Sequence, residues 1–364
     1  DHLAQENIEW IGEDIAERFT SAAVDCSKLN DSSAKKDLSI VYTPLFGSGR
    51  DFVLDALEKD GFSQVHLVKK QAGFDGKFPG LRKPNPEEPE VFRIAEREAL
   101  QEHADLMIAT DPDSDRIGAG VICDSKAFFF TGNQIGALLA DFLSRQGSVK
   151  GKIMVTTVVT GDLGSRIVTS RGATVIHTLT GSKFVCEEMN HMEAGEFLLG
   201  YEESHGYIGG MHIRDKDGVL AAMLLCETAA WHKTQGKTLL DALEDLYQEY
   251  GYYIDEQDSF VFEGAKGAKE MQKIMARLRS RRGSVFAPLG KPDKMLDYEK
   301  GVDELPRSNV LKFFFPNGSW VAVRPSGTEP KIKFYYCIRG KDQRQAEDLY
   351  EAVQNSVEEF LRTF

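Results

Sequence analysis

A β-strand, an α-helix and a second β-strand follow one another twice along this chain, and no other feature constrains the fold as strongly. The first unit spans residues 38–68 and the second spans residues 153–178, and in each the helix ends at a glycine, Gly61 or Gly172. Strands that are joined by a helix lie parallel in one sheet. The sequence therefore predicts two successive α/β domains with mixed or parallel sheets.

The last third of the chain lacks this alternation. Its apolar residues instead indicate a helix around 271–278, two strands on either side of 325–330, and a long final helix with an apolar stripe. This order predicts a smaller α+β domain at the C-terminus. The expected parts are a tail and linker at 1–37, α/β domains at 38–147 and 148–256, and the α+β domain at 257–364.

Charge and cysteine content narrow the class of protein. The 364 residues carry 44 Lys+Arg against 57 Asp+Glu, a net charge of −13, which disfavours binders of nucleic acid or anionic membranes because both need dense basic surfaces. The longest apolar stretch, residues 219–226, is far shorter than the ~20 residues that span a bilayer. Five scattered cysteines without a CxxC pair favour the reducing cytoplasm. None of these features indicates an oligomeric state.

Alternate carboxylates follow one of the predicted strands. Asp111, Asp113 and Asp115 lie in the segment DPDSDR, which ends at Arg116. Ligands bind at the carboxyl ends of strands in open α/β sheets, and three carboxylates on one side of a loop suit a hard cation such as Mg²⁺. An EF-hand is excluded because Arg116 and Ile122 stand where Gly and Glu are needed. A solvated acidic turn is the alternative.

A second polar segment, GYEESHG at 200–206, also follows a predicted strand. Glu202 and Ser204 offer a carboxylate and a hydroxyl that suit hydrogen bonds to neighbouring sugar hydroxyls. Lys216 follows in an Asp-Lys-Asp alternation, which an ordinary surface ion pair explains equally well. His205 by itself indicates a structural histidine rather than a catalytic base.

A third polar segment, RPSGTEPK at 324–331, lies between two predicted strands. Gly327 permits a nest of backbone N–H groups, while Ser326 and Thr328 add hydroxyl donors. Arg324 adds a planar guanidinium that suits phosphate. A plain hairpin turn explains the proline and glycine but not this concentration of donors. The chain contains no Walker A sequence, so a nucleotide-hydrolysing P-loop is not expected.

In this order, the three segments resemble those of the α-D-phosphohexomutase family, most closely the phosphoglucomutases within the phosphoglucomutase and phosphomannomutase group. The resemblance covers about residues 38–364 and includes TPLFG at 43–47, PNPE at 84–87, TGNQ at 131–134 and TGSK at 180–183. It implies a four-domain enzyme in which each domain supplies one loop to a central cleft. The mechanism that the resemblance implies is that a phosphoserine donates its phosphoryl group to a hexose phosphate, and that the resulting hexose 1,6-bisphosphate reorients and returns the other phosphate to the serine.

The resemblance also implies roles for individual residues in moving a phosphoryl group between C1 and C6 of a hexose phosphate, with glucose as the expected sugar. The implied Mg²⁺ ligands are Asp111, Asp113 and Asp115, with Arg116 supporting their loop. The implied sugar-binding residues are Glu202, Ser204 and Lys183, with Lys216 near the phosphosugar as a proton-transfer partner. The implied phosphate-binding residues are Arg324, Ser326, Gly327 and Thr328.

One family motif is absent. The nucleophilic serine of the family lies in a Thr-Ala-Ser-His-Asn-Pro-like loop, and no Ser-His-Asn occurs here. Because the chain also begins with Asp1, we expect a fragment without its first domain that is inactive alone. The alternatives are phosphomannomutase or phosphopentomutase specificity, a non-catalytic sugar-phosphate binder, and a Mg²⁺-dependent phosphatase with Asp111 as nucleophile. Asp115 stands against the phosphatase, because its motif needs Thr or Val there.

Overall fold

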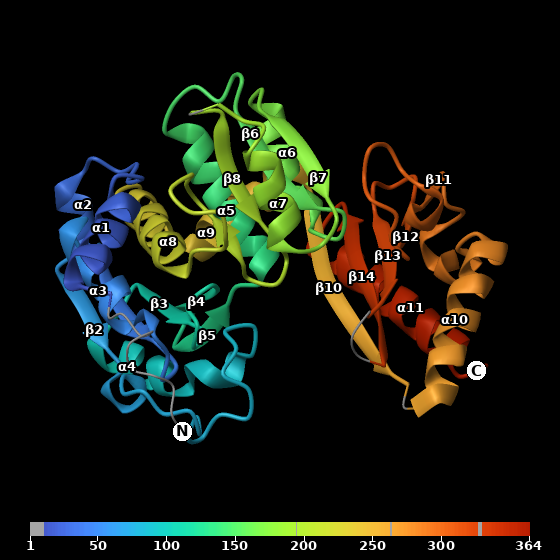
Figure 1. Cartoon of the computed structure of the whole chain (residues 1–364), viewed down its shortest axis with the longest axis horizontal. Coiled ribbons are helices and arrows are strands. Elements are labelled where there is room, and N and C mark those ends of the chain that lie inside the picture. The colour runs from blue at the N-terminus through green and yellow to red at the C-terminus, as the bar shows by residue number, and fades with distance from the viewer. Residues whose placement is uncertain (1–10, 194, 263, 327–329) are drawn as a thin grey trace, which may run out of the picture.

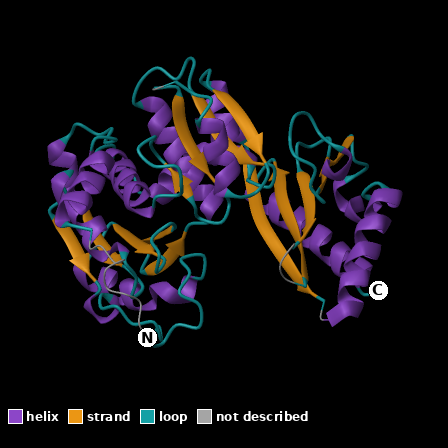
Figure 2. Cartoon of the chain, in the orientation of Figure 1, coloured by secondary structure: helices purple, strands orange, loops and turns teal. Residues whose placement is uncertain are grey.

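The computed structural model describes residues 11–193, 195–262, 264–326 and 330–364. Three sheets follow one another along the chain (Figure 1), and Figure 2 shows helices packed beside each of them. The first two sheets combine parallel and antiparallel strands, and the third is antiparallel. The prediction of two α/β units followed by an α+β unit is therefore confirmed. The expected domain boundaries stay predictions.

The first sheet has the strand order β2-β1-β3-β4-β5. Its strands are β1 (Ser39–Thr43), β2 (Gln64–Leu67), β3 (Leu106–Thr110), β4 (Ile117–Cys123) and β5 (Lys126–Phe129). The helices of this part are α1 (Glu13–Val24), α2 (Ser32–Asp37), α3 (Gly49–Lys59) and α4 (Arg93–Glu102), with short 3₁₀ turns at Lys69–Gln71 and Pro89–Phe92. The central strand β1 pairs in parallel with β2 and β3, which places the Asp111 loop at a carboxyl edge of the sheet.

The second sheet has the order β7-β6-β8-β9. Its strands are β6 (Ile153–Thr157), β7 (Thr174–Thr178), β8 (Phe197–Tyr201) and β9 (Tyr207–Ile208). The helices are α5 (Gly132–Arg145), α6 (Asp162–Ser170), α7 (Ser182–Met189), α8 (Gly218–Lys233) and α9 (Leu239–Tyr250). A capping box between Thr131 and Gln134 starts α5, and one between Thr238 and Asp241 starts α9.

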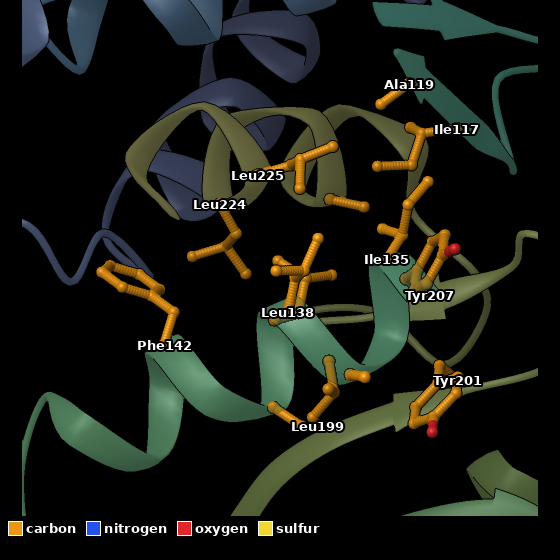
Figure 3. Packing of buried hydrophobic residues seen from close by; sticks show 14 of the residues in the cluster. Ile117, Ala119, Ile135, Leu138, Phe142, Leu199, Tyr201, Tyr207, Leu224 and Leu225 are labelled. Atoms are coloured by element: carbon orange, nitrogen blue, oxygen red, sulfur yellow. The ribbon is translucent and has the colours of Figure 1, made fainter. Parts of the chain in front are cut away.

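Helix α8 joins the first two sheets into one hydrophobic core. It is mostly apolar and almost completely buried, as expected for a helix enclosed by protein. It packs against α2 and α3 of the first unit and against α5 and α9 of the second. Figure 3 shows Leu224 and Leu225 of α8 beside Leu138 of α5, with Ile117 of β4 close by. Within the described ranges, no helix is long and apolar enough to cross a membrane.

The third sheet is antiparallel, with the order β10-β14-β13-β12-β11. Its strands are β10 (Tyr252–Val261), β11 (Lys294–Asp297), β12 (Leu311–Phe314), β13 (Trp320–Pro325) and β14 (Lys331–Gly340). The helical segments are α10 (Gly264–Arg281), α11 (Gln343–Leu361) and 3₁₀ turns at Ser284–Leu289 and Tyr298–Lys300. The predicted apolar stripe of the last helix is confirmed, because Ala346, Val353 and Val357 are buried.

The third unit contacts the second through a buried lysine. Lys312 of β12 donates a hydrogen bond from Nζ to the Val158 carbonyl at 2.8 Å. The same ammonium lies 3.7 Å from the ring centroid of Trp320. A carbonyl oxygen and an aromatic face both compensate for the loss of water around this charge. Lys312 therefore holds β12 against the loop after β6.

The N-terminal segment differs from the sequence prediction. The predicted tail and linker, residues 1–37, ends in a Ser/Lys/Asp-rich segment that contains α2, whose first backbone N–H groups are capped by Asp31. Lys35 of α2 is 4% exposed, and its Nζ lies 2.6 Å from Asp60 Oδ1 and 2.7 Å from Glu227 Oε1. Two carboxylates make the burial of this lysine possible. The prediction failed because the partners lie far away in the sequence, so that a Ser/Lys/Asp-rich segment looked solvated.

His232, near the end of α8, should make stability depend on pH. It is buried, and within the described residues neither ring nitrogen has a hydrogen-bond partner. Burial lowers the pKa of His232 from 6.5 to about 4. Its contribution to stability is therefore complete above pH 6.5 and is lost as the pH falls toward 4. At about 1.4 kcal/mol per pKa unit, we expect a loss of about 3 kcal/mol.

The measurement is urea unfolding of the wild-type chain and of His232→Leu between pH 7 and pH 4. The variant should lose less stability than the wild type over this interval, because it has no imidazole to protonate. His191→Gln is the matched control, since His191 is exposed. If the free energy of unfolding falls equally with pH in the wild type and in His232→Leu, the lowered pKa of His232 would be contradicted.

Candidate active site

Three carboxylates gather in the loop after β3. One oxygen from each of Asp111, Asp113 and Asp115 lies within 4.8 Å of the other two. Asp111 is buried, Asp115 is half-buried and Asp113 is exposed. Burial, together with the two neighbouring negative charges, raises the pKa of Asp111 to about 7. A set of hard oxygen ligands that gains from a nearby positive charge fits Mg²⁺.

Backbone contacts from two sides hold this loop in place. The Ser48 N–H donates to the Pro112 carbonyl at 2.8 Å, and the Gly218 N–H donates to the Ser114 carbonyl at 3.0 Å. The approach is so close that a Cβ atom at Gly47 would lie 2.4 Å from the Cα of Pro112. Only glycine fits there without a shift of the backbone. The segment at 43–47 thus supports the carboxylate loop.

Arg116 ties the loop to two other segments. Its Nη1 lies 2.6 Å from Glu87 Oε1, and its Nε lies 3.8 Å from Asp111 and 3.6 Å from Asp115. Its backbone forms an antiparallel bridge with Gly206. Sequence reasoning gave Glu87 no role. Its place in the PNPE segment was noticed, but only the fold brings it to Arg116.

The loop after β8 lies directly beside the carboxylate loop. The Ile117 N–H donates to the His205 carbonyl at 3.1 Å, and His205 Nδ1 lies 2.9 Å from the Ile117 carbonyl oxygen. His205 is buried, and burial lowers its pKa. These contacts support the interpretation of His205 as a structural residue. Ser204 lies half-buried in the same turn.

Glu202 is a buried carboxylate that is influenced by positive charges from all three units. It is 6% exposed, and its Oε1 accepts a hydrogen bond from the Gly181 N–H at 2.7 Å. Burial raises the pKa of Glu202, while this hydrogen bond and three positive charges oppose the rise. The three charges belong to Lys216, Arg116 and Arg324. The structure therefore brings together residues that lie far apart in the sequence.

Lys216 connects the second polar segment with the first. Its ammonium forms an ion pair with the Asp115 carboxylate. Its methylene chain crosses Gly206, where a Cβ atom would lie 2.4 Å from the Cδ of Lys216. Lys183, by contrast, is exposed in the first turn of α7, with its Nζ 4.8 Å from the ring centroid of Phe184. Within the described residues, the Lys183 ammonium thus contacts a neighbouring ring and no other predicted site residue.

The third polar segment is the hairpin between β13 and β14. The Ser326 N–H donates to the Lys331 carbonyl at 2.8 Å, which closes the hairpin. Arg324 lies in β13, half-buried. Gly327 and Thr328 lie outside the described residues, so their predicted contacts with phosphate stay predictions.

Two cavities border these groups. One, of about 190 Å³, is lined by residues of all three units, among them Glu87, Glu203 and Tyr335. Glu203 was passed over by sequence reasoning, because a doubled glutamate does not reveal which carboxylate faces which way. The other cavity, of about 580 Å³, lies between Asp113 and the apolar side of α1. The carboxylate loop is therefore accessible from this second cavity.

Known proteins with a similar sequence have the same order of domains. Family profiles described as phosphoglucomutase/phosphomannomutase alpha/beta/alpha domain II, alpha/beta/alpha domain III and C-terminal domain match residues 17–123, 131–250 and 260–356. The phosphoglucomutase of Staphylococcus haemolyticus is 34% identical over 98% of this chain and 68% of its own length. The chain belongs to the phosphoglucomutase/phosphomannomutase family. The resemblance seen in the three polar segments is thereby confirmed.

Solved structures of the phosphoglucomutase/phosphomannomutase family share the fold. Pp63/parafusin from Paramecium, a phosphoglucomutase, has a TM-score of 0.71 at 21% identity and covers 94% of this chain. A putative phosphomannomutase from Thermus thermophilus has a TM-score of 0.66 at 20% identity over 94% of the chain.

The chain spans only part of its family relatives. It covers 61% of parafusin and 66% of the Thermus protein. A phosphoglucomutase of Staphylococcus aureus, 35% identical over 84% of this chain, is covered over 57% of its length. The matched family domains are II, III and the C-terminal domain.

Proposed function

We propose that the chain forms the metal-, sugar- and phosphate-binding part of a phosphohexose mutase. The reaction moves a phosphoryl group between C1 and C6 of a hexose phosphate through a phosphoserine and a hexose 1,6-bisphosphate. The nucleophilic serine is proposed to lie outside these 364 residues, because the Ser-His-Asn motif is absent from them. Glucose is the proposed sugar, in keeping with the phosphoglucomutases among the relatives.

The contact between the carboxylate loop and the sugar-binding loop carries this proposal. Lys216 pairs with Asp115, and the backbone of Arg116 bridges to Gly206. The proposed metal site and the proposed site for sugar hydroxyls would therefore form one continuous surface. A mutase needs this arrangement, because the reacting phosphoryl group must lie beside the metal while the sugar is held by its other hydroxyls.

Each group has a proposed task. The carboxylates Asp111, Asp113 and Asp115 hold Mg²⁺, which when bound offsets the charge that develops during in-line transfer. Glu202 and Ser204 orient the sugar through its hydroxyls, and Lys183 supports the phosphosugar. Lys216 Nζ is the proton-transfer partner of the reacting hydroxyl. The proposed site for the phosphate that is not reacting consists of Arg324, Ser326, Gly327 and Thr328.

The open space beside Asp113 supports the phosphoserine route. The cavity of about 580 Å³ reaches Asp113, Ser114 and Asp115 from the side of α1. A phosphoserine on another domain can enter there without displacing the sugar-binding loop. A phosphatase that uses Asp111 as nucleophile fits less well, because Asp111 is 7% exposed and accepts a hydrogen bond from the Arg116 N–H at 3.0 Å.

The test is ³¹P NMR of glucose 1-phosphate with Mg²⁺ and a trace of glucose 1,6-bisphosphate. A longer protein, in which this chain follows a phosphoserine domain, should produce glucose 6-phosphate without releasing inorganic phosphate. The 364-residue chain alone should produce neither. Release of inorganic phosphate by the chain alone would instead establish the phosphatase, and mutase turnover by the chain alone would refute the missing nucleophile.

A further inference from the structure

We infer that Lys216 is a mobile counter-ion of the carboxylate loop, which pairs with Asp115 when no metal is bound and leaves it for the sugar-binding loop when a divalent cation binds. This inference rests on the proposed function, because it concerns the same metal and sugar sites. It adds a coupling between them. Metal binding would release a positive charge toward the sugar phosphate, so each ligand would favour the binding of the other.

The position of Lys216 shows that its ammonium is directed to the carboxylate loop. Its methylene chain lies against Gly206, at which any larger residue would displace it. The side chain is only 15% exposed, and the ammonium ends at Asp115. Asp115 is one of the three carboxylates whose oxygens lie within 4.8 Å of one another. The ammonium therefore neutralises part of the charge that a bound cation would neutralise.

A divalent cation and this ammonium compete for one carboxylate. Both are positive, and both gain most from the same cluster of negative charge. If the cation binds the three carboxylates, the ammonium loses its partner and is repelled at short range. Mg²⁺ also demands close and regular contacts with its oxygen ligands, which leaves little room for an ammonium on Asp115.

Arg116 has more anchoring contacts than Lys216. The guanidinium of Arg116 lies 2.6 Å from Glu87 and more than 3.5 Å from both Asp111 and Asp115. Its backbone is also bound, through the bridge to Gly206. In the part of the chain that the structure describes, the only ion pair of Lys216 is with Asp115. A compact charge on a flexible stem is suited to such an exchange.

The sugar-binding loop offers the released ammonium a second partner. The positive charge of Lys216 already acts on Glu202, which is buried and held by the Gly181 N–H. A shift from Asp115 toward Glu202 keeps the methylene chain near Gly206. It moves the charge to the place where the phosphosugar is proposed to bind. Metal binding would thus determine where Lys216, the proposed proton-transfer partner, lies relative to the sugar phosphate.

The experiment measures Mn²⁺ affinity of the 364-residue chain by isothermal titration calorimetry. Lys216→Met keeps the apolar stem over Gly206 but removes the competing charge, so Mn²⁺ should bind about threefold to tenfold more tightly. Lys216→Arg keeps the charge and should bind Mn²⁺ within about twofold of the wild type. Lys126→Met is the control for net charge, because Lys126 is exposed at the far end of β4 and β5.

A second titration uses glucose 6-phosphate as the probe, with and without Mg²⁺. In the wild-type chain Mg²⁺ should tighten its binding, and in Lys216→Met this gain should disappear. The inference would be overturned if Lys216→Met melts at the wild-type temperature but binds Mn²⁺ no more tightly than the wild type. That result would not contradict the proposed metal site. Failure of the wild-type chain to bind Mn²⁺ at all would overturn the proposed metal site itself.

Discussion

Asp113→Ala is expected to weaken Mg²⁺ binding by the chain more than about 100-fold, since even residues that only orient metal ligands cost 10- to 100-fold. In a full-length mutase that contains this chain, phosphoryl transfer should fall to background. Asp113 is the exposed member of the carboxylate cluster. The substitution therefore removes one metal ligand, and it also removes a negative charge that repels the other two carboxylates. It does not disturb the core, so the fold should be unaffected. Calorimetry and an assay for glucose 6-phosphate measure the two effects.

The control for this variant is Asp124→Asn. Asp124 is an exposed carboxylate in the turn between β4 and β5, where its φ of 48° is one that asparagine also adopts readily. The change removes one negative charge from the same sheet but none from the cluster, so Mg²⁺ binding should stay as in the wild type. Full phosphoryl-transfer activity in Asp113→Ala would show that Asp113 is not a metal ligand. An equal loss of Mg²⁺ affinity in both variants would indicate a general effect of charge.

Glu227→Ala is expected to destabilise the N-terminal part of the chain by about 3–5 kcal/mol, the usual cost of removing one partner from a buried ion pair. Glu227 is completely buried in α8. It accepts hydrogen bonds from Ser27 Oγ at 2.5 Å, from the Lys28 N–H at 2.9 Å and from the Leu29 N–H at 3.0 Å, and it pairs with Lys35. Alanine would leave the buried Leu29 N–H without its acceptor and would remove one of the two carboxylates that surround Lys35.

Hydrogen exchange across residues 13–37 and urea unfolding measure this loss. Both helices of the segment, α1 and α2, should exchange faster in Glu227→Ala than in the wild type, because Glu227 fastens the segment to α8. Glu227→Gln keeps one oxygen acceptor for these donors, so it should lose less stability than the alanine variant. Glu249→Ala is a surface control, since Glu249 is exposed in the neighbouring helix α9. Protection of α1 and α2 at the wild-type level in Glu227→Ala would contradict the assignment.

Much of the fold was predictable because local patterns determine it. The alternation of strand and helix at 38–68 and 153–178 appears in the structure as the parallel pairs β1–β2 and β6–β7. The final helix was marked by its own apolar stripe. Such features need only the periodicity of neighbouring residues and turn signals at their ends.

Long-range pairs were not predictable from these patterns. Nothing near Lys35 indicates that Asp60 and Glu227 surround it, and nothing near Lys312 indicates a contact with Val158. Helix α5 begins within the predicted first α/β domain but packs against α6 of the second unit. Its apolar stripe shows that it is buried but not against which sheet.

The candidate site likewise has features that the sequence predicts and contacts that it does not. The carboxylates, the sugar-binding segment and the hairpin were found by residue type and by their places at strand ends. The contacts between these groups could not be predicted from the sequence. The ion pairs of Glu87 with Arg116 and of Lys216 with Asp115 depend on how separate loops meet. The predicted roles of the site residues stay predictions until they are tested by substitution.

Helix α8 has a consequence for how the protein is made in the cell. The first sheet is complete once residue 129 has been synthesised, but the core it shares with α8 waits for residues 218–233. During translation, the apolar faces that α8 will cover stay open while about 100 further residues emerge, for several seconds or more at cellular rates of synthesis. We expect the nascent chain to bind chaperones over this interval, because its apolar surface is exposed. Variants that slow the docking of α8 should lower the yield of soluble protein more than its final stability suggests.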